Sequence, residues 1–211
     1  MDDLAGVNLK RCGLLTVDLQ NDFLHPQGAY GRAGQGSEYI AALPDRILPI
    51  VQALRAQGGF YLSAQFTLVP GREGEPLIAS HLKQIRPFLT KGDFAPGSFG
   101  HALTDTLAPA DFTIEKVAYS AFYQTRLEYI LKAVGIDHLI VGGIVTNGGV
   151  ASTLRDAHMR NIDTIMLTDG CAAFDPVVHD ATVLSLATVT HRMTCAEASQ
   201  WLNASTCDGH E

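Results

Sequence analysis

The sequence has few charged residues and few cysteines, and it contains no long uninterrupted apolar run. Charged side chains make up 18% of the 211 residues and apolar ones 46%, a balance that is typical of a globular protein and excludes an intrinsically disordered one. No run approaches the roughly 18 consecutive apolar residues of a membrane span. The acidic start, Met1-Asp2-Asp3, has no apolar signal region. We therefore expect a cytoplasmic protein that does not enter a membrane.

The sequence also lacks the features of nucleic-acid-binding and metal-binding proteins. Its net charge is −7, and it has no basic stripe with interleaved aromatic residues, which argues against binding to nucleic acid. The histidines form no pair at helical or strand spacing. The four cysteines fit reduced thiols and do not have the paired spacing of a zinc site; they are Cys12, Cys171, Cys195 and Cys207. We expect neither a metal nor a cofactor.

Short apolar runs alternate with segments of helical periodicity along the whole chain. We expect strands at 13–17, 60–65, 112–114, 139–141, 164–168 and 192–194, and helices at about 47–54, 125–134, 150–157, 177–188 and 196–202. This alternation predicts an α/β fold with three α/β/α layers, in which helices cover both faces of a mainly parallel sheet of about six strands. We see no internal repeat and no domain boundary, so residues 1–211 are expected to form one domain.

One stretch, residues 139–157, predicts a strand, a glycine-rich turn and a helix in succession. This order places the N–H groups of a helix N-terminus at the carboxyl edge of the sheet, where they stabilise anions and developing negative charge. Asp18 and Lys116 follow other predicted strands and fall at the same edge, where ligands bind in open α/β sheets. The alternative is structural: an ordinary turn, a capping aspartate and a surface lysine.

Residues 66–111 are rich in proline and glycine and show little periodicity. A stretch of this length without regular structure is unusual in a compact domain. It either forms a lid over a functional site or contains elements that the pattern does not reveal.

Several motifs match one family in the right order along nearly the whole chain. They are Leu15-Thr16-Val17-Asp18-Leu19-Gln20-Asn21-Asp22-Phe23, Lys116 with Tyr119-Ser120-Ala121-Phe122, Gly143-Ile144-Val145-Thr146-Asn147, Val150-Ala151-Ser152-Thr153 with Asp156-Ala157, and Asp169 with Ala172. In these motifs the sequence resembles the isochorismatase-like hydrolases, also called the cysteine hydrolase superfamily.

The resemblance implies catalytic roles for particular residues. In most of the family an aspartate, a lysine and a cysteine form a catalytic triad, and Asp18 and Lys116 match the first two. The cysteine position is occupied by Gly149, as in the isochorismatases, which cleave a vinyl ether by protonation and attack of water. The resemblance further implies a substrate-binding Gln65 and a non-proline cis peptide at Val145–Thr146.

The resemblance also implies a substrate pocket and an assembly. The turn residues Val145, Thr146, Asn147 and Gly148 are expected to face a small-molecule substrate. Phe23 and Phe122 are expected to wall the pocket, although core packing explains aromatic residues at these positions equally well. A homo-oligomer, a dimer or a tetramer, is implied, with residues 66–111 helping to close the pocket against a neighbouring subunit.

The leading functional hypothesis is a cofactor-independent hydrolase of a small organic metabolite that uses Asp18, Lys116 and water. One alternative is a non-catalytic relative that binds a metabolite or a partner. Another is an amide or ureido hydrolase with a displaced nucleophile. The pKa of Asp18 is subject to two opposing effects, since burial raises it and Lys116 lowers it. If Asp18 acts as a general acid, the effect of burial on its pKa must exceed that of Lys116, and the sequence leaves this open.

Overall fold

A computed structural model describes residue 4 and residues 6–204 of the chain. Six strands form one sheet in the order β3-β2-β1-β4-β5-β6, and every neighbouring pair is parallel. The strand order reverses between β1 and β4, which is where ligands bind in folds of this kind. The strands are β1 (Cys12–Val17), β2 (Phe60–Phe66), β3 (Phe112–Lys116), β4 (His138–Ile144), β5 (Asp163–Ala172) and β6 (His191–Met193).

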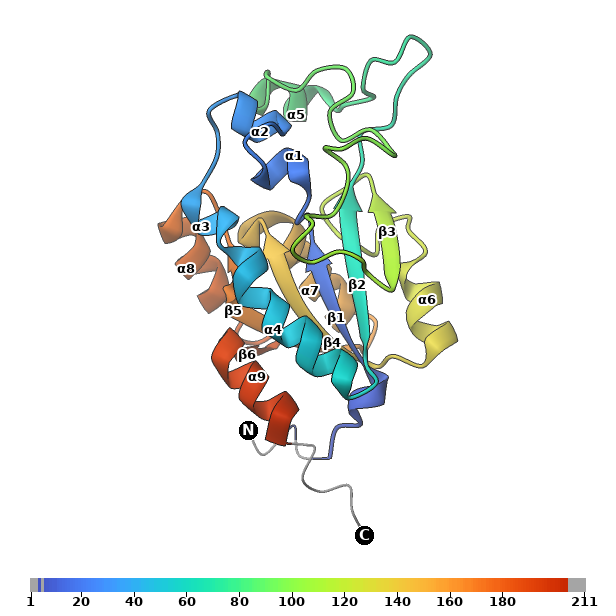
Figure 1. Ribbon diagram of the computed structural model, residues 1–211, viewed down its shortest axis with the longest axis vertical. Helices are drawn as coiled ribbons and strands as arrows, with labels where there is room; N and C mark the ends of the chain where they lie inside the picture. Colours follow the sequence, from blue (N-terminus) through green and yellow to red (C-terminus); the bar gives the residue numbers. More distant parts are fainter. Residues whose placement is uncertain (1–3, 5, 205–211) are drawn as a thin grey trace.

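Helices connect the strands and cover the sheet (Figure 1). The longer ones are α4 (Leu43–Ala56), α6 (Leu127–Val134), α7 (Ala151–His158), α8 (Pro176–Ser185) and α9 (Cys195–Ala204). Shorter ones are η2 (Leu9–Arg11), α1 (Asn21–Leu24), α2 (Ala29–Arg32), α3 (Glu38–Ala41), α5 (Ser80–Ile85) and the π-helical turn η3 (Thr146–Val150).

The helix ends follow from local chemistry. Asp175 accepts a hydrogen bond from the N–H of Val177 at 2.8 Å and caps α8, whose first residue is Pro176. Gly135 adopts a left-handed conformation, φ 78°, and ends α6. Helix α4 begins at Leu43, four residues before the expected start at Ile47, so Pro49 lies inside the helix.

Two apolar cores enclose the sheet, one on each face. Ile47 and Leu54 of α4 and Leu202 of α9 belong to the first core. Leu131 of α6 and Leu154 of α7 belong to the second core. These two cores give the three layers that the alternation of strands and helices predicts, and the mainly parallel sheet of about six strands is confirmed as a six-stranded, wholly parallel one.

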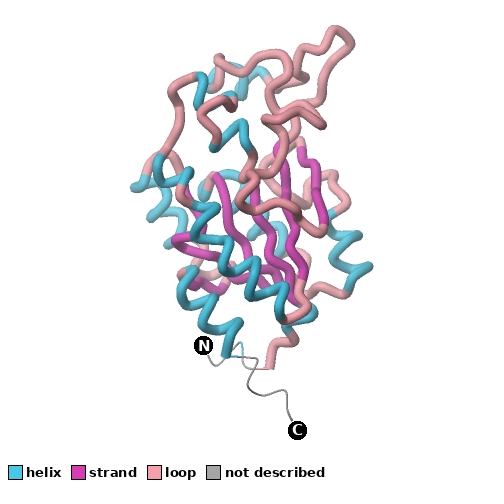
Figure 2. The backbone as a smooth tube through the Cα atoms, in the orientation of Figure 1, coloured by secondary structure: helices cyan, strands magenta, loops and turns pink. Residues whose placement is uncertain are grey.

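Loops gather at the carboxyl ends of the strands (Figure 2). The segment between β2 and β3 is mostly loop there and contains one short helix, α5, which lies near α1 and α2 (Figure 1). None of the residues of α5 is fully buried, and the helix packs against the first core through the partly buried Leu82. No helix in the described part of the chain is both long and apolar enough to cross a membrane.

A non-proline cis peptide joins Ile144 to Val145, at the end of β4. The expected position, Val145–Thr146, is therefore wrong by one residue. The bond lies at the last residue of the strand, directly before the glycine-rich turn.

Candidate active site

Two charged side chains meet at the carboxyl edge of the sheet. Asp18 follows β1 directly, adopts a positive φ of 60°, and donates its backbone N–H to the Ala64 carbonyl at 2.8 Å. Lys116 is the last residue of β3, and its Nζ lies 2.8 Å from Oδ2 of Asp18 and 3.1 Å from the Ala118 carbonyl oxygen. The two residues are only 6% and 1% exposed. The expected proximity of this pair is confirmed.

Burial governs the ionisation of Asp18. Removal from water raises the pKa of this carboxyl group above its usual range, and this effect exceeds the opposing effects of Lys116 and of the more distant Arg86 guanidinium. The second carboxyl oxygen, Oδ1, is buried and has no hydrogen-bond partner within the described residues. A carboxyl group with a raised pKa and an unpaired oxygen retains a proton more readily than a surface aspartate does.

The pair lies at a cavity of about 250 Å³. The lining contains one acidic residue, Asp18, two basic residues, Lys116 and Arg86, and otherwise mainly apolar and aromatic groups. The full lining is Asp18, Phe23, Phe66, Ala79, His81, Leu82, Arg86, Lys116, Val117, Ala118, Tyr119, Val145 and Gly149. Its size and composition suit a small organic molecule with polar groups at fixed positions.

Gly149 contributes backbone alone to this cavity. A Cβ atom placed on it would lie 3.3 Å from Oδ2 of Asp18, and 2.9 Å from both the Ile144 carbonyl oxygen and Cγ1 of Val17. The residue is buried within η3, immediately before α7. No cysteine, serine or threonine is among the residues that line the cavity. A serine, threonine or cysteine nucleophile of the acyl-enzyme type is therefore absent from the described lining.

Of the expected substrate-binding residues, Phe23 and Val145 line the cavity. Gln65 does not, because neighbouring strand residues point to opposite faces and Phe66 takes the cavity position. Phe122 packs instead into the second core and lies under the Arg160 guanidinium, 5.0 Å from ring centroid to Cζ.

The remaining turn residues also lie outside the cavity lining. Thr146 is fully buried, and its Oγ1 is 2.8 Å from Nδ1 of His179 on α8. Asn147 is exposed to solvent. Gly148 packs against the Tyr119 ring, where an added Cβ would lie 3.2 Å from Cε1. The turn therefore reaches the cavity through Val145 and Gly149 only.

Several cavity residues were missed by sequence reasoning. Arg86, His81 and Leu82 come from α5 or the residue after it, inside the segment that shows no clear periodicity. Tyr119 belongs to a motif that was recognised, but no site role was given to it. A six-residue helix with no buried face leaves no periodic signal, so only the excess of proline and glycine pointed to this region.

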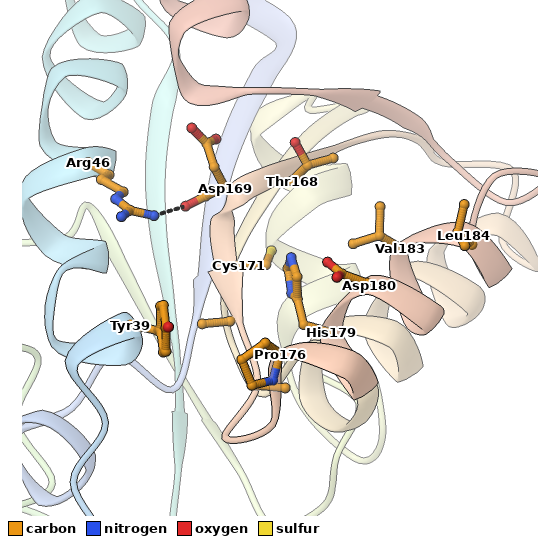
Figure 3. A pocket seen from close by; sticks show the side chains of 12 residues that line it. Tyr39, Arg46, Thr168, Asp169, Cys171, Pro176, His179, Asp180, Val183 and Leu184 are labelled. Carbon is orange, nitrogen blue, oxygen red and sulfur yellow. Dashed lines mark hydrogen bonds between the residues drawn. The ribbon is translucent and has the colours of Figure 1, made fainter.

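A second, larger cavity of about 550 Å³ lies between α4, the end of β5 and α8 (Figure 3). The Arg46 guanidinium donates to the Asp169 carbonyl oxygen there at 3.2 Å. Cys171 lines this cavity and not the one that holds Asp18, and burial raises the pKa of its thiol. Cys171 is therefore separated from the carboxylate–lysine pair and poorly suited to act as a displaced nucleophile.

Comparison with known proteins gives one consistent family. Residues 12–198 match the model of the isochorismatase domain. The chain is 36% identical over 167 residues to the ureidoacrylate amidohydrolase RutB of Yersinia enterocolitica, a match that covers 74% of this chain and 73% of that protein. It is 35% identical over 187 residues to the protein of the same name from Methylobacterium radiotolerans, covering 83% of this chain and 72% of the relative.

Solved structures share the fold. A cysteine hydrolase from Pseudomonas syringae pv. phaseolicola superimposes with a TM-score of 0.81 at 24% identity, over 94% of this chain and 95% of that one. An N-carbamoylsarcosine amidase from Thermoplasma acidophilum superimposes with a TM-score of 0.68 at 22% identity, over 88% of this chain and 96% of that one.

Proposed function

The chain belongs to the isochorismatase family of hydrolases, and on that premise we propose that it hydrolyses a small organic metabolite with Asp18, Lys116 and water, without a cysteine nucleophile or a cofactor. The observation that carries the proposal is the state of Asp18. Its carboxyl group is buried at the cavity, has a raised pKa and leaves Oδ1 without a partner. Such a group retains its proton more readily than a surface aspartate, as general acid catalysis requires.

Each residue has one task in this reaction. Asp18 delivers its proton to the substrate, and Lys116, 2.8 Å away, stabilises the carboxylate that remains. Gly149 leaves the space beside Oδ2 of Asp18 free of side-chain atoms, so that substrate or water can occupy it. Water attacks the substrate directly, whereas in a cysteine-dependent hydrolase water attacks an acyl-enzyme that the cysteine has formed first.

We propose a C–N bond of a ureido acid as the one cleaved, because the relatives are named ureidoacrylate amidohydrolases. The absence of serine, threonine and cysteine from the described cavity lining favours the bond between nitrogen and the vinyl carbon over the amide bond that this name denotes. In 3-ureidoacrylate a nitrogen is attached to a carbon–carbon double bond. Asp18 protonates the carbon next to the carboxylate, and a cation forms at the carbon that bears nitrogen. Water adds to that carbon and its proton returns to Asp18. The hydroxyl group then gives up its proton, the nitrogen gains one and the C–N bond breaks, giving urea and 3-oxopropanoate.

The products distinguish this route from the alternative one. Attack of water on the ureido carbonyl, with Asp18 as a base, releases carbamate and 3-aminoacrylate instead. We would incubate the protein with 3-ureidoacrylate and follow urea and ammonia separately by enzymatic assay and NMR. Urea as the first product supports protonation at carbon. Carbamate and ammonia without urea would contradict it.

The matched variants are Asp18→Asn and Asp137→Asn. Both replace a carboxylate by an amide, but Asp137 lies before β4 at the opposite edge of the sheet and pairs with Arg11 at 2.7 Å. We expect Asp18→Asn to lower turnover by about 10²–10⁴-fold, the usual contribution of a general acid, and Asp137→Asn to leave it unchanged. Saturable binding without turnover of ureido acids, amides or vinyl ethers would favour a non-catalytic binding protein.

A further inference from the structure

The side chain of Gln20 takes the place of a strand residue beside β2. The hydrogen bonds between β1 and β2 end where the Asp18 N–H donates to the Ala64 carbonyl at 2.8 Å, because Asp18 has a positive φ of 60° and turns the chain away. Two residues further along β2, the backbone of Phe66 faces the same side. Its N–H donates to Oε1 of Gln20 at 2.7 Å, and its carbonyl oxygen accepts from Nε2 at 3.0 Å. One amide side chain thus pairs with both backbone groups of Phe66.

This side chain is buried and makes full use of its polar groups. Gln20 is 0% exposed, and its Nε2 also donates to the His101 carbonyl oxygen at 2.9 Å. Both amide protons and the amide oxygen are therefore occupied. Gln20 belongs to the first motif of the family resemblance, two residues after Asp18, but it is not among the described residues that line the cavity. Its role must therefore be exerted through the residues that it contacts.

The N–H of Phe66 also has a second acceptor within reach. It interacts with the carboxyl group of Asp18 and lowers the pKa of that group, although the effect of burial is larger. The short hydrogen bond of this N–H nevertheless goes to Gln20, and Oδ1 of Asp18 has no partner in the described part of the chain. A hydrogen bond to a carboxylate favours the ionised form. Gln20 and Asp18 therefore compete for one donor, and the protonation of Asp18 depends on how that donor is shared.

We propose that Gln20 is a positioning residue that preserves the proton-donating form of Asp18, because its side-chain amide holds the Phe66 N–H away from the carboxyl group. This inference rests on the proposed function and adds to it a residue that controls the acid without touching the substrate. The same hydrogen bonds fix Phe66, whose ring lines the cavity and lies 5.5 Å from Nζ of Lys116. One side chain thus acts on the surroundings of both members of the charged pair.

The other titratable groups that face Asp18 belong to different elements. They are Lys116 at the end of β3, Tyr119 in the loop after it, His81 in α5, Arg86 directly after α5, and Tyr30 in α2. Within the described residues, the side chain of Gln20 forms hydrogen bonds with backbone atoms only. An uncharged replacement of Gln20 therefore changes the hydrogen bonding of Asp18 without removing a charge beside it.

The test measures the ionisation of Asp18 and needs no turnover. Gln20→Met and Gln20→Glu both remove the amide N–H donors, but only Gln20→Glu retains an acceptor for the Phe66 N–H. We would label aspartate isotopically at its carboxyl carbon, titrate each protein by NMR, and identify the Asp18 resonance by its absence in Asp18→Asn. In Gln20→Met we expect the proton affinity of Asp18 to be about tenfold lower, because the released N–H stabilises the carboxylate. In Gln20→Glu it should not fall.

Asn21→Leu is the matched control. Asn21 is also buried, and its Nδ2 donates to the Phe99 carbonyl oxygen at 2.9 Å, so this variant removes a hydrogen bond to the same segment without affecting Phe66. The titration of Asp18 should stay as in the original protein. An unchanged or higher proton affinity in Gln20→Met would overturn the proposal. An equal fall in Gln20→Met and Gln20→Glu would also overturn it, because water entering a loosened site relieves the burial of Asp18 in both variants.

A measurement on the original protein covers the case in which Gln20→Met does not fold, which thermal unfolding establishes. Scalar coupling across a hydrogen bond is detectable by NMR and identifies the acceptor. We expect coupling between the backbone nitrogen of Phe66 and Cδ of Gln20. Coupling to Cγ of Asp18 in its place would contradict the proposal.

The proposed function can fail separately. Unchanged turnover in Asp18→Asn would refute the acid mechanism, while the NMR titrations still decide the role of Gln20. If Asp18 is the acid, kcat/KM of Gln20→Met should begin to fall at a lower pH than that of the original protein, in step with the titration of Asp18. Lost turnover in Asp18→Asn together with an unchanged titration in Gln20→Met would refute the role of Gln20 and leave the mechanism intact.

Discussion

The space beside Gly149 gives the sharpest test of the proposed mechanism. In Gly149→Ala the new Cβ would lie 2.9 Å from the Ile144 carbonyl oxygen and from Cγ1 of Val17, which real Cβ atoms essentially never do. The carbonyl belongs to the backbone at the end of β4, so relief requires a main-chain shift. We expect a loss of about 1–3 kcal/mol in the free energy of unfolding, the usual cost of overpacking. In a chain of this size each kcal/mol lowers Tm by about 2–4 °C.

The same methyl group would lie 3.3 Å from Oδ2 of Asp18. It fills the space assigned to substrate or water and displaces the reacting groups, and a misplacement of about 1 Å can cost about 10²-fold in rate. Gly36→Ala is the control, because nothing lies within 4 Å of a Cβ at that residue. Urea unfolding and steady-state kinetics measure both effects. Unchanged turnover in Gly149→Ala, with Gly36→Ala also unchanged, would refute the assignment of Gly149 to the reaction centre.

Gly149→Cys extends the test to thiol chemistry. Burial raises the pKa of the native thiols of Cys12 and Cys195 to about 12, so these react slowly with alkylating agents. A cysteine at residue 149 would stand before the N-terminus of α7 and near Lys116, and both lower a thiol pKa. We expect it to alkylate faster than Cys12 and Cys195 and to titrate below the free value of about 8.5. A titration at or above that value would show that this turn does not activate a thiol.

Three further predictions concern charge and assembly. Lys116→Met should lower turnover by about 10²–10³-fold, because the carboxylate formed from Asp18 loses its stabilising ammonium group; unchanged kcat would refute this role. Because folding raises the pKa of Asp18, its protonated form stabilises the fold fully below about pH 3.8 and this contribution declines as pH rises through the folded pKa. As pH rises through the folded pKa, the free energy of unfolding of the native protein should therefore fall more than that of Asp18→Asn, as measured by urea unfolding. If Asp18 is the acid, kcat/KM should fall over the same pH range. Finally, we expect a homo-oligomer, with α8 as a candidate interface since Val177 and Leu184 are 74% and 71% exposed; sedimentation as a 22.7 kDa monomer would contradict it.

The elements of the fold that carry strong periodicity could be predicted from the sequence. All six strands were placed within a few residues, because each is a short apolar run bounded by turn residues. The meeting of Asp18 with Lys116 also followed, since carboxyl ends of parallel strands lie at one edge. The short helices α1, α2 and α5 were not predicted, because one turn of helix has no repeat to detect.

The site residues that the sequence placed wrongly depend on side-chain direction. The loop after β3 is fixed by a hydrogen bond from the Ala121 N–H to Oγ1 of Thr153 on α7 at 3.0 Å, and Phe122 follows it into the second core. Thr146 likewise points to His179, because this hydrogen-bond partner lies on α8, a helix that is distant in the sequence. Such tertiary contacts have no local signature. Arg86 was missed because it reaches the cavity only when two irregular segments fold over the same edge.

The strand order explains why the carboxyl–lysine pair consists of a short side chain and a long one. Asp18 follows β1, next to the point where the strand order reverses, and Lys116 ends β3, with β2 between them. A lysine side chain can span the intervening strand, and Phe66 at the end of β2 fills the space beneath it, with its ring centroid 5.5 Å from Nζ. The aromatic ring keeps water from the lysine on that side, and burial then raises the pKa of Asp18 while Lys116 limits the rise. The edge of the sheet thus raises the pKa of one carboxyl group beside a glycine without a side chain, and the proposed acid catalysis depends on both features.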